Sequence, residues 1–257
     1  MKGTKETQIA AQLYTLRDYL QTPKDIAKTL AKVRKIGYRI VQLSGLGKIE
    51  TKELKRILDG DGLIGNSTHT SLERLMKETD LVIEEHKILG AEYAVCPWIP
   101  DEYHNLAGYR RLARELSKTG KILAKHKITL CYHNHAFEFE KFGQKTGLEI
   151  LYSESDPRYL KAELDTYWVA FGGGDQAAWC LKYSGRFPIA HLKDLGMKDN
   201  KQVYLEVGEG NLDWKSIIAA CKKAGVKLYA VEQDVCQRDP FESIKISLNN
   251  LHKFGLK

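Results

Sequence analysis

The sequence predicts an α/β fold, a single (β/α)₈ barrel that spans residues 1–257 as one domain. Short runs of β-branched or apolar residues alternate with longer amphipathic segments, which gives eight strand-then-helix units. The length of 257 residues agrees with the size of about 250 residues common for such barrels. The turn after the first strand, QLYTLRD, lacks the glycines of a doubly wound sheet's phosphate turn. A closed parallel barrel is therefore the expected architecture.

The first unit carries the clearest boundary signals. A strand at 9–14 precedes Thr22, a good N-cap, and Pro23, which suits the first helical position. Apolar residues then recur at spacings of three and four until Gly37, as expected for the buried face of a helix that a glycine ends. We therefore predict a helix between Pro23 and Gly37.

The same reading defines the remaining units. The other strands are expected at residues 39–43, 62–68, 93–96, 128–132, 160–165, 188–192 and 227–231. Helices are expected at 51–58, closed by Gly60, at 72–89, closed by Gly90, at 106–126 and at 241–254.

Composition argues against membrane and nucleic-acid partners. The net charge is +7, but the lysines lie between apolar residues at helical spacing, as in KDIAKTLAKVRK, which is typical of solvated outer helix faces. The apolar runs are far shorter than the ~18 residues of a membrane span, and no apolar segment follows the lysines of the N-terminus. The five cysteines lack CxxC spacing and are expected to be reduced. We predict a cytoplasmic location.

Ionisable residues follow the last four strands, where a barrel of this kind places its active site. Glu138, Asp165, His191 and Glu232 can meet there, and three carboxylates with one imidazole suit Mn²⁺, Mg²⁺, Co²⁺ or Zn²⁺. Each of them also has a structural reading: Asp165 can bind a backbone amide, His191 can be an interior histidine, and Glu232 can pair with Lys193. Burying all four without a metal would be costly.

Five segments resemble a known family: IAAQLYTLRD, CYHNHAFEF, ELDTYW, AHLKD and AVEQD, in that order. Together they are similar to the sugar phosphate isomerase/epimerase group of the xylose isomerase-like barrels, within the AP endonuclease family 2 superfamily. The resemblance runs from about Ile9 to the C-terminus. It implies one divalent metal ion held by Asp165, His191 and Glu232.

The end of the fifth strand departs from the family pattern. Relatives such as D-tagatose 3-epimerase carry a glutamate there, whereas this chain has His133-Asn134-His135. The nearest carboxylate, Glu138, is assigned as the fourth ligand, with His133 or His135 as substitutes.

The resemblance implies an isomerase or epimerase that acts on a sugar or keto sugar. A carboxylate would take the proton α to a carbonyl, giving an enediolate stabilised by the metal. Candidate proton-transfer residues are Glu232, Glu138 and His135. Loss of a β-substituent would instead give a lyase or dehydratase, acting on a keto sugar, a 3-keto glycoside or an inosose. The same residues serve all of these outcomes.

Five further residues are candidates for binding a carbohydrate substrate: His69, His133, Lys193, Trp98 and Trp168. Each has a structural alternative, such as an ion pair of Lys193 with Asp194 or Glu232, or a buried place for the tryptophans. The segment VGEGNLDW is predicted to be a structural turn. No glycine loop for a phosphate follows the last two strands, and a homodimer is a candidate assembly.

Two other functional classes fit these residues less well. A nuclease like endonuclease IV would need a histidine three residues after Asp165, where this chain has Trp168, and a His-x-His pair beginning at His191, which is missing. A metal-free binding protein on the same fold would be expected to have lost a ligand, yet Asp165, His191 and Glu232 are all present.

Overall fold

The structure, a computed structural model, describes residues 8–257 and contains a closed barrel of eight parallel strands. The strands are β1 (Ile9–Gln12), β2 (Ile40–Leu43), β3 (Ile64–His69), β4 (Tyr93–Cys96), β5 (Thr129–His133), β8 (Leu160–Asp165), β9 (Ile189–Leu192) and β12 (Leu228–Val231). Each strand pairs with its neighbour along the chain, and β12 closes the barrel on β1. The predicted (β/α)₈ barrel is confirmed.

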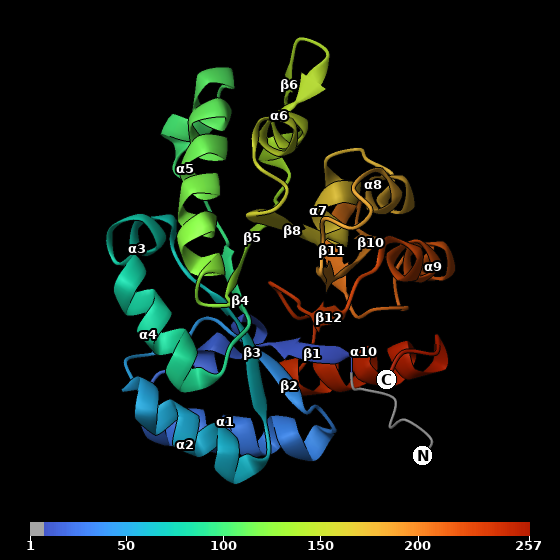
Figure 1. Ribbon diagram of the computed structural model, residues 1–257. Helices are drawn as coiled ribbons and strands as arrows, with labels where there is room; N and C mark the ends of the chain where they lie inside the picture. The colour runs from blue at the N-terminus through green and yellow to red at the C-terminus, as the bar shows by residue number, and fades with distance from the viewer. Residues whose placement is uncertain (1–7) are drawn as a thin grey trace, which may run out of the picture.

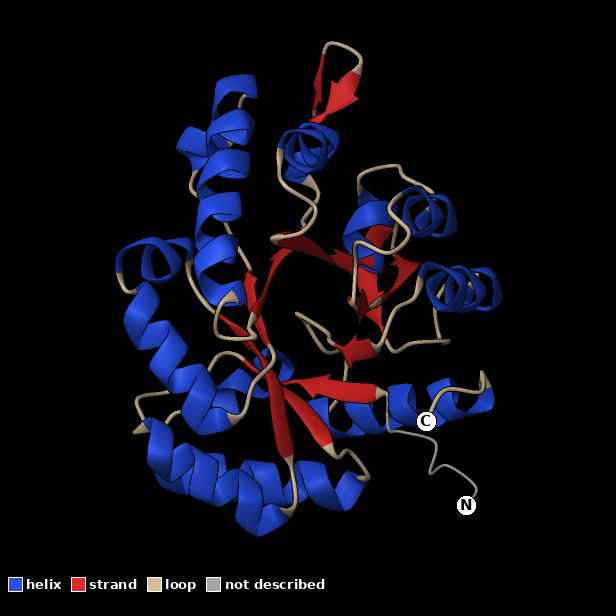
Figure 2. Ribbon diagram, viewed as in Figure 1, coloured by secondary structure: helices blue, strands red, loops and turns tan. Residues whose placement is uncertain are grey.

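Helices enclose the barrel on its outside, as Figure 1 and Figure 2 show. They are α1 (Pro23–Ile36), α2 (Thr51–Asp61), α3 (Leu72–Lys77), α4 (Thr79–Leu89), α5 (Leu106–Ala124), α6 (Gly147–Glu154), α7 (Thr166–Phe171), α8 (Gln176–Lys182), α9 (Trp214–Ala224) and α10 (Pro240–Lys253). The loops at the carboxyl ends of the strands add the 3₁₀ helices η1 (Leu13–Tyr19), η2 (Asp101–Tyr103) and η3 (Phe137–Phe139). They also add two hairpins, β6 (Lys141–Phe142) with β7 (Lys145–Thr146) and β10 (Asp194–Lys198) with β11 (Lys201–Leu205).

The boundary signals of α1 act as predicted. The Thr22 hydroxyl accepts a hydrogen bond from the backbone N–H of Asp25, at 3.2 Å, and Pro23 is the first helical residue. Gly37 ends the helix with φ of 129°, a value that L side chains rarely adopt.

The structure differs from the prediction in three segments of the chain. The first strand ends at Gln12 because its side chain accepts the N–H of Tyr14 and the chain turns into η1. Helix α2 runs past Gly60, and the left-handed residue that ends it is Gly62, so β3 begins only at Ile64. The segment after β3 is two helices, α3 and α4, which meet at Glu78.

The barrel interior has an apolar end and a polar end. A small cluster of Ala10, Ile40, Tyr93, Val95, Cys131, Ile189, Leu228 and Ala230 fills the apolar part. Side chains two residues apart on a strand face the same way, so the next inward positions toward the carboxyl ends are polar. Examples are Gln12 after Ala10 and His191 after Ile189, both buried. The fold thus places buried polar side chains together at one end of the barrel.

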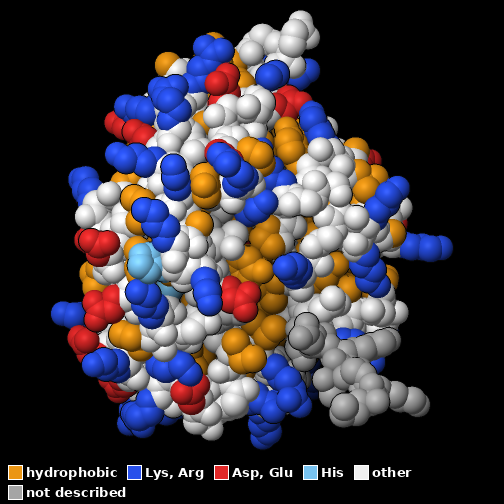
Figure 3. Space-filling view, in the orientation of Figure 1, with side chains coloured by type: hydrophobic (Ala, Val, Ile, Leu, Met, Phe, Trp, Pro, Cys, Tyr) orange, Lys and Arg blue, Asp and Glu red, His pale blue; other side chains and the backbone are white. Residues whose placement is uncertain are grey.

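The outer surface agrees with the predicted solvated helix faces. Lys and Arg side chains are spread over the face seen in Figure 3, with acidic side chains among them. Among residues 8–257, no helix combines the length and the hydrophobicity needed to cross a bilayer. Residues 1–7, which carry the N-terminal lysines weighed as a signal segment, lie outside the described part of the chain.

The segment VGEGNLDW is structural, as predicted, and it is organised by Asp194. The buried Asp194 carboxylate accepts the backbone N–H groups of Gly208 at 2.9 Å, Gly210 at 3.0 Å and Leu212 at 3.2 Å. The indole N–H of Trp214 donates to it at 2.5 Å. A Cβ on Gly210 would lie 2.4 Å from an Asp194 oxygen, so only glycine permits this close approach.

Candidate metal centre and active-site pocket

Strand register brings the candidate ligands together. Asp165, the last residue of β8, is the direct partner of His191 in β9. His133, the last residue of β5, is the partner of Glu163 in β8. Glu232 follows β12, and its backbone N–H donates to Leu192 of β9 at 3.3 Å. Neighbouring parallel strands therefore deliver these side chains to one end of the barrel.

His133, Asp165, His191 and Glu232 form what we call the four-residue cluster. One ligand atom from each lies within 4.8 Å of the others. His191 Nδ1 is 3.1 Å from Glu232 Oε2 and 3.8 Å from Asp165 Oδ2, while His133 Nε2 is 3.7 Å from the same Asp165 oxygen. All four residues are buried. Three of the four residues predicted as metal ligands thus meet here.

The structure does not bring Glu138 into this cluster. Glu138 lies in η3, where the Tyr132 hydroxyl donates to one of its oxygens at 2.7 Å and the His135 N–H to the other at 2.9 Å. Burial raises the pKa of Glu138 to about 8, against these hydrogen bonds. His133 occupies the fifth-strand position instead, because a strand's last residue reaches the centre and a residue five positions further does not.

Lys193 lies beside the cluster. Of the two partners predicted for it, Asp194 and Glu232, it pairs with Glu232. Its Nζ is 2.7 Å from Glu232 Oε2, 3.0 Å from Asp165 Oδ2 and 2.7 Å from Asp234 Oδ2, and its side chain is 1% exposed. Burial disfavours its charge, but the three carboxylates outweigh burial and raise the pKa of Lys193 well above its usual value. Lys193 is therefore an ammonium ion held against the cluster.

Glu163 is a buried residue of the site to which the sequence reading assigned no role. Its Oε2 is 2.9 Å from His69 Nε2, 3.1 Å from His191 Nε2 and 3.2 Å from His133 Nδ1. A signal was available in the motif ELDTYW, because Glu163 stands two residues before Asp165 and must face the same side of the strand. Together with these three histidines it forms a second group that offers metal-ligand atoms.

Burial and neighbouring charges set the protonation of the cluster. Burial raises the pKa of Asp165 to about 6, and burial with the charge of His191 lowers the pKa of His133 to about 3. Burial disfavours charge on His191, but Glu163 and Glu232 outweigh it and raise its pKa to about 10. His191 is consequently protonated on both nitrogens near neutral pH when no cation is bound, and a bound cation would displace one proton.

The four-residue cluster fits a divalent cation. Two imidazoles and two carboxylates are a donor set that Zn²⁺, Mn²⁺ and Co²⁺ accept. Asp165 divides its oxygens: Oδ1 accepts the N–H of Trp168 at the start of α7, while Oδ2 lacks a well-aligned hydrogen bond although Lys193 Nζ lies 3.0 Å away. Asp165 Oδ2 is therefore available to bind a cation together with the other three residues of the cluster.

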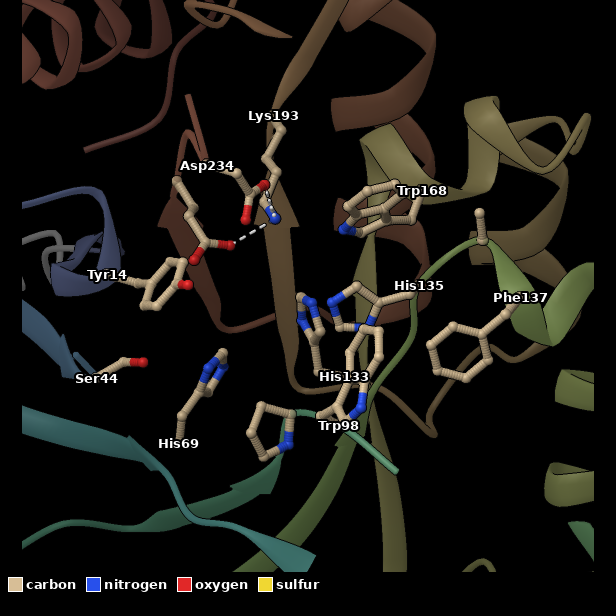
Figure 4. A pocket seen from close by; sticks show the side chains of 13 residues that line it. Tyr14, Ser44, His69, Trp98, His133, His135, Phe137, Trp168, Lys193 and Asp234 are labelled. Atoms are coloured by element: carbon tan, nitrogen blue, oxygen red, sulfur yellow. Dashed lines mark hydrogen bonds and ion pairs between the residues drawn. The ribbon is translucent and has the colours of Figure 1, made fainter. Parts of the chain in front are cut away.

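Two members of the cluster, His133 and Glu232, line a pocket of about 580 Å³. Figure 4 shows His69, His133 and Lys193 facing this space, with Trp98, Phe137 and Trp168 around it. Its lining comprises Tyr14, Ser44, His69, Pro97, Trp98, His133, His135, Ala136, Phe137, Trp168, Lys193, Glu232 and Asp234. Every residue predicted to bind substrate is among them. The volume is in the range of about 300–1,000 Å³ common for small-molecule sites.

The aromatic wall lines the pocket, with Trp98 exposed and Trp168 half-buried. Trp98 is 52% exposed and meets the rings of His135 and Phe137 edge-on, with centroids at 4.8 Å and 5.0 Å. Trp168 packs at 5.3 Å from His135. Burial, followed by the charge of His133, lowers the pKa of His135, so this ring is neutral.

The chain is similar to proteins of known sequence and to solved structures. An inosose dehydratase of Clostridium tetani (strain Massachusetts / E88) is 29% identical over 154 residues, which is 52% of this chain and 50% of that protein. The chain thus aligns with about half the length of this curated relative. A sugar phosphate isomerase/epimerase from Parabacteroides distasonis ATCC 8503 superposes with a TM-score of 0.81 at 25% identity, covering 98% of this chain and 95% of that one.

A more distant structure, the IolI protein with a bound zinc atom, has a TM-score of 0.72 at 13% identity and covers 96% of this chain and 98% of that one. This likeness concerns the fold alone. The family model described as a xylose isomerase-like TIM barrel matches residues 30–249. The chain therefore belongs to the xylose isomerase-like TIM barrel family.

Proposed function

We propose that the four-residue cluster holds one divalent cation and that the protein abstracts the proton α to the carbonyl of a keto sugar, as an isomerase or epimerase. The observation that carries this proposal is the convergence of ligand atoms from His133, Asp165, His191 and Glu232, two of which, His133 and Glu232, line a pocket with an aromatic wall. A sugar phosphate isomerase/epimerase of the same fold at 25% identity supports the reaction class. Zinc in the similarly folded IolI supports the cation.

A cation bound here supplies Lewis-acid polarisation of the carbonyl and hydroxyl oxygens of the sugar. The proton acceptor proposed in this chain is Glu232. Burial favours its neutral form, but Lys193 and His191 outweigh burial and hold the pKa of Glu232 well below its usual value. Glu232 is thus a carboxylate at neutral pH, the form that binds a cation or accepts a proton.

Lys193 is proposed to work beside Glu232. Its ammonium group lies 2.7 Å from Glu232 Oε2 and lines the same pocket. Loss of the α-proton turns the carbonyl oxygen into an enediolate oxygen, and a nearby ammonium stabilises that charge. Return of the proton to the opposite face of the same carbon gives an epimer. Return to the former carbonyl carbon, with transfer of the α-hydroxyl proton to the former carbonyl oxygen, gives an isomer. The aromatic wall of Trp98 and Trp168 would pack against the sugar ring, and His69 would contact a hydroxyl.

A second candidate function is dehydration of a keto sugar or inosose, favoured by the inosose dehydratase relatives. The α-carbon–hydrogen bond breaks, a carbon–carbon double bond forms, and the β-hydroxyl leaves as water after accepting a proton. Lys193 is the proposed donor of this proton, because it is an ammonium ion that lines the pocket. Proton abstraction by Glu232 is common to both functions.

Exchange of the α-proton with solvent tests the proposal. The protein, saturated with Mn²⁺ or Zn²⁺, is incubated in deuterated water with ketoses, 3-keto glycosides and inososes, and deuterium is located by NMR. We expect deuterium at the α-carbon of one substrate class, with an epimer or isomer as product for the first function and an unsaturated product for the second. No uptake across the panel by the metal-loaded protein would contradict both and favour a binding protein.

Substitution of Glu232 makes the same test specific. Glu232→Gln keeps an oxygen ligand but removes the basic group, so the exchange rate should fall about 10²–10⁴-fold while the protein folds normally. The matched control is Glu206→Gln, which alters a buried carboxylate that pairs with Ser243 and Arg238 outside the pocket, and should keep the rate. Near-normal exchange in Glu232→Gln would place the base elsewhere, at His135 or Glu138.

A further inference from the structure

Glu163 contacts His133 and His191 on the side of each ring that faces away from Asp165. It is fully buried in β8, and its Oε2 lies 3.1 Å from His191 Nε2 and 3.2 Å from His133 Nδ1. The opposite nitrogens of the two rings, His191 Nδ1 and His133 Nε2, face Asp165 at 3.8 Å and 3.7 Å. Each imidazole therefore bridges from Glu163 to the four-residue cluster.

The surroundings of His191 Nε2 determine where its proton lies. Gln42 Nε2 is 2.6 Å from Glu163 Oε1, and since a carboxylate only accepts, this contact fixes the Gln42 amide with its nitrogen toward Glu163. Gln42 Oε1 then faces His191 Nε2 at 2.5 Å. His191 Nε2 consequently has two oxygen acceptors, Gln42 Oε1 and Glu163 Oε2, and must carry a proton. In a neutral imidazole this leaves the lone pair on Nδ1, which faces the cluster.

His133 lies between Glu163 and the cluster in the same way as His191, but with Nδ1 toward Glu163 and Nε2 toward the cluster. Its Nδ1 is the nitrogen near Glu163, although at 3.2 Å the contact is not well aligned as a hydrogen bond. Its Nε2 faces Asp165, so a proton on Nδ1 leaves a lone pair at the cluster. One carboxylate on β8 thus contacts two imidazole rings, one on each of the strands that flank it, β5 and β9.

We propose that Glu163, with Gln42, is a positioning residue that keeps the outer ring nitrogens of His191 and His133 protonated, so that their inner nitrogens bind the cation. This inference rests on the cation site of the proposed function. The alternative is that Glu163 itself binds a second ion with His69, His133 and His191. We favour positioning because both Glu163 oxygens already have partners, Gln42 at 2.6 Å and His69 at 2.9 Å, whereas Asp165 Oδ2 lacks a well-aligned hydrogen bond.

The proton positions are tested on the unmodified protein. Zinc-loaded protein with ¹⁵N-labelled histidine is studied by NMR, and zinc is suited to this because it is diamagnetic. We expect a protonated Nε2 and a zinc-bound Nδ1 for His191, and the reverse for His133. A zinc-bound Nε2 in His191 would overturn the proposal, and this measurement requires no variant to fold.

The contribution of Glu163 is tested by Glu163→Gln, which keeps the size of the side chain but places an N–H group where the histidines need an acceptor. Loss of such an outer partner commonly weakens metal affinity about 10–100-fold. We expect that loss for Zn²⁺ in a competition titration, with stoichiometry still one ion per chain. Glu206→Gln alters a buried carboxylate that pairs with Ser243 and belongs to neither group of metal-ligand atoms, so this variant should bind Zn²⁺ as the unmodified protein does.

Two outcomes of the titration would overturn the inference. One is an unchanged affinity in Glu163→Gln. The other is two Zn²⁺ ions in the unmodified protein and one in the variant, which would make Glu163 a ligand. If the unmodified protein binds no zinc at all, the failure is that of the proposed function, so the two failures are distinguishable.

Discussion

At the residue scale, the metal-ligand positions that could be predicted are those at the end of a barrel strand or directly after it. Asp165, His191 and Glu232 could be predicted because each ends or closely follows a barrel strand, and parallel strands place such ends together. Glu138 was the natural fourth choice by chemistry, but its carboxylate is used by Tyr132 and by the chain itself at His135. A choice between a histidine on the strand and a carboxylate in the loop depends on loop conformation, which spacing alone does not determine.

Substitution of Glu138 can distinguish a structural role of this residue from a role as metal ligand. In Glu138→Leu, an apolar side chain replaces the acceptor of both the Tyr132 hydroxyl and the His135 N–H, so two buried donors lose their acceptor. We expect the free energy of unfolding to fall by about 1–3 kcal/mol, measured by urea denaturation. Metal affinity should change less than about threefold, since the side chain lies outside the four-residue cluster. A tenfold loss of affinity at unchanged stability would instead identify Glu138 as a ligand.

At the element scale, helix starts could be predicted better than helix ends. Thr22 and Pro23 define the start of α1 because the N-cap chemistry is local, and the same holds for Asn105, whose side chain accepts the Gly108 N–H ahead of α5. Gly60 was the wrong end for α2, because a second glycine, Gly62, lay two residues further along and took the left-handed conformation.

The hairpin of β10 and β11 was not predicted, although its turn carries a signal. Asp199 and Asn200 occupy left-handed conformations with φ of 49° and 59°, as a tight turn of two adjacent positive-φ residues requires. The strands on either side mix apolar with charged residues and are partly exposed, so they lack the continuous buried run of a barrel strand. Asp194, the first residue of β10, also binds the segment that follows β11, and those partners lie 14 to 20 residues away in sequence.

The contact between α4 and β3 should respond to pH through His86. Its Nδ1 donates to the Val82 carbonyl at 2.7 Å and its Nε2 is 3.0 Å from the Thr68 hydroxyl. Burial holds the pKa of His86 below its usual 6.5, against a weaker opposite effect of its hydrogen bond to the Val82 carbonyl. The unfolded chain therefore takes up this proton at a higher pH than the folded protein does. The free energy of unfolding should consequently fall as the pH drops below about 6.5.

Substitution of His86 separates its contribution to the pH dependence of the unfolding free energy from that of the other histidines. His86→Gln removes the group, so its unfolding free energy should depend less on pH than that of the unmodified protein. The difference in slope is at most about 1.4 kcal/mol per pH unit for one proton. Urea denaturation between pH 5 and pH 7 measures both slopes, and parallel curves for the two proteins would show that His86 does not titrate as described.

At the scale of the whole molecule, closure of the barrel is what turns separate strand ends into a site. His133 and Glu232 are far apart in the chain, yet β5, β8, β9 and β12 are successive neighbours around the barrel. The count of strand-then-helix units was sufficient to predict this closure. It was not sufficient to predict the deeper layer of Gln42, Glu163 and His191, because that layer depends on which residues of each strand face inward at the same height.

We propose that one divalent cation binds to His133, Asp165, His191 and Glu232. A crystal grown with saturating Mn²⁺, with anomalous diffraction at the manganese edge and elemental analysis of the same protein, tests this most directly. We expect one ion per chain, coordinated by His133 Nε2, His191 Nδ1 and the carboxylates of Asp165 and Glu232. A chain without manganese, in which Lys193 and protonated His191 neutralise the carboxylates, would contradict this, as would an ion coordinated by Glu163.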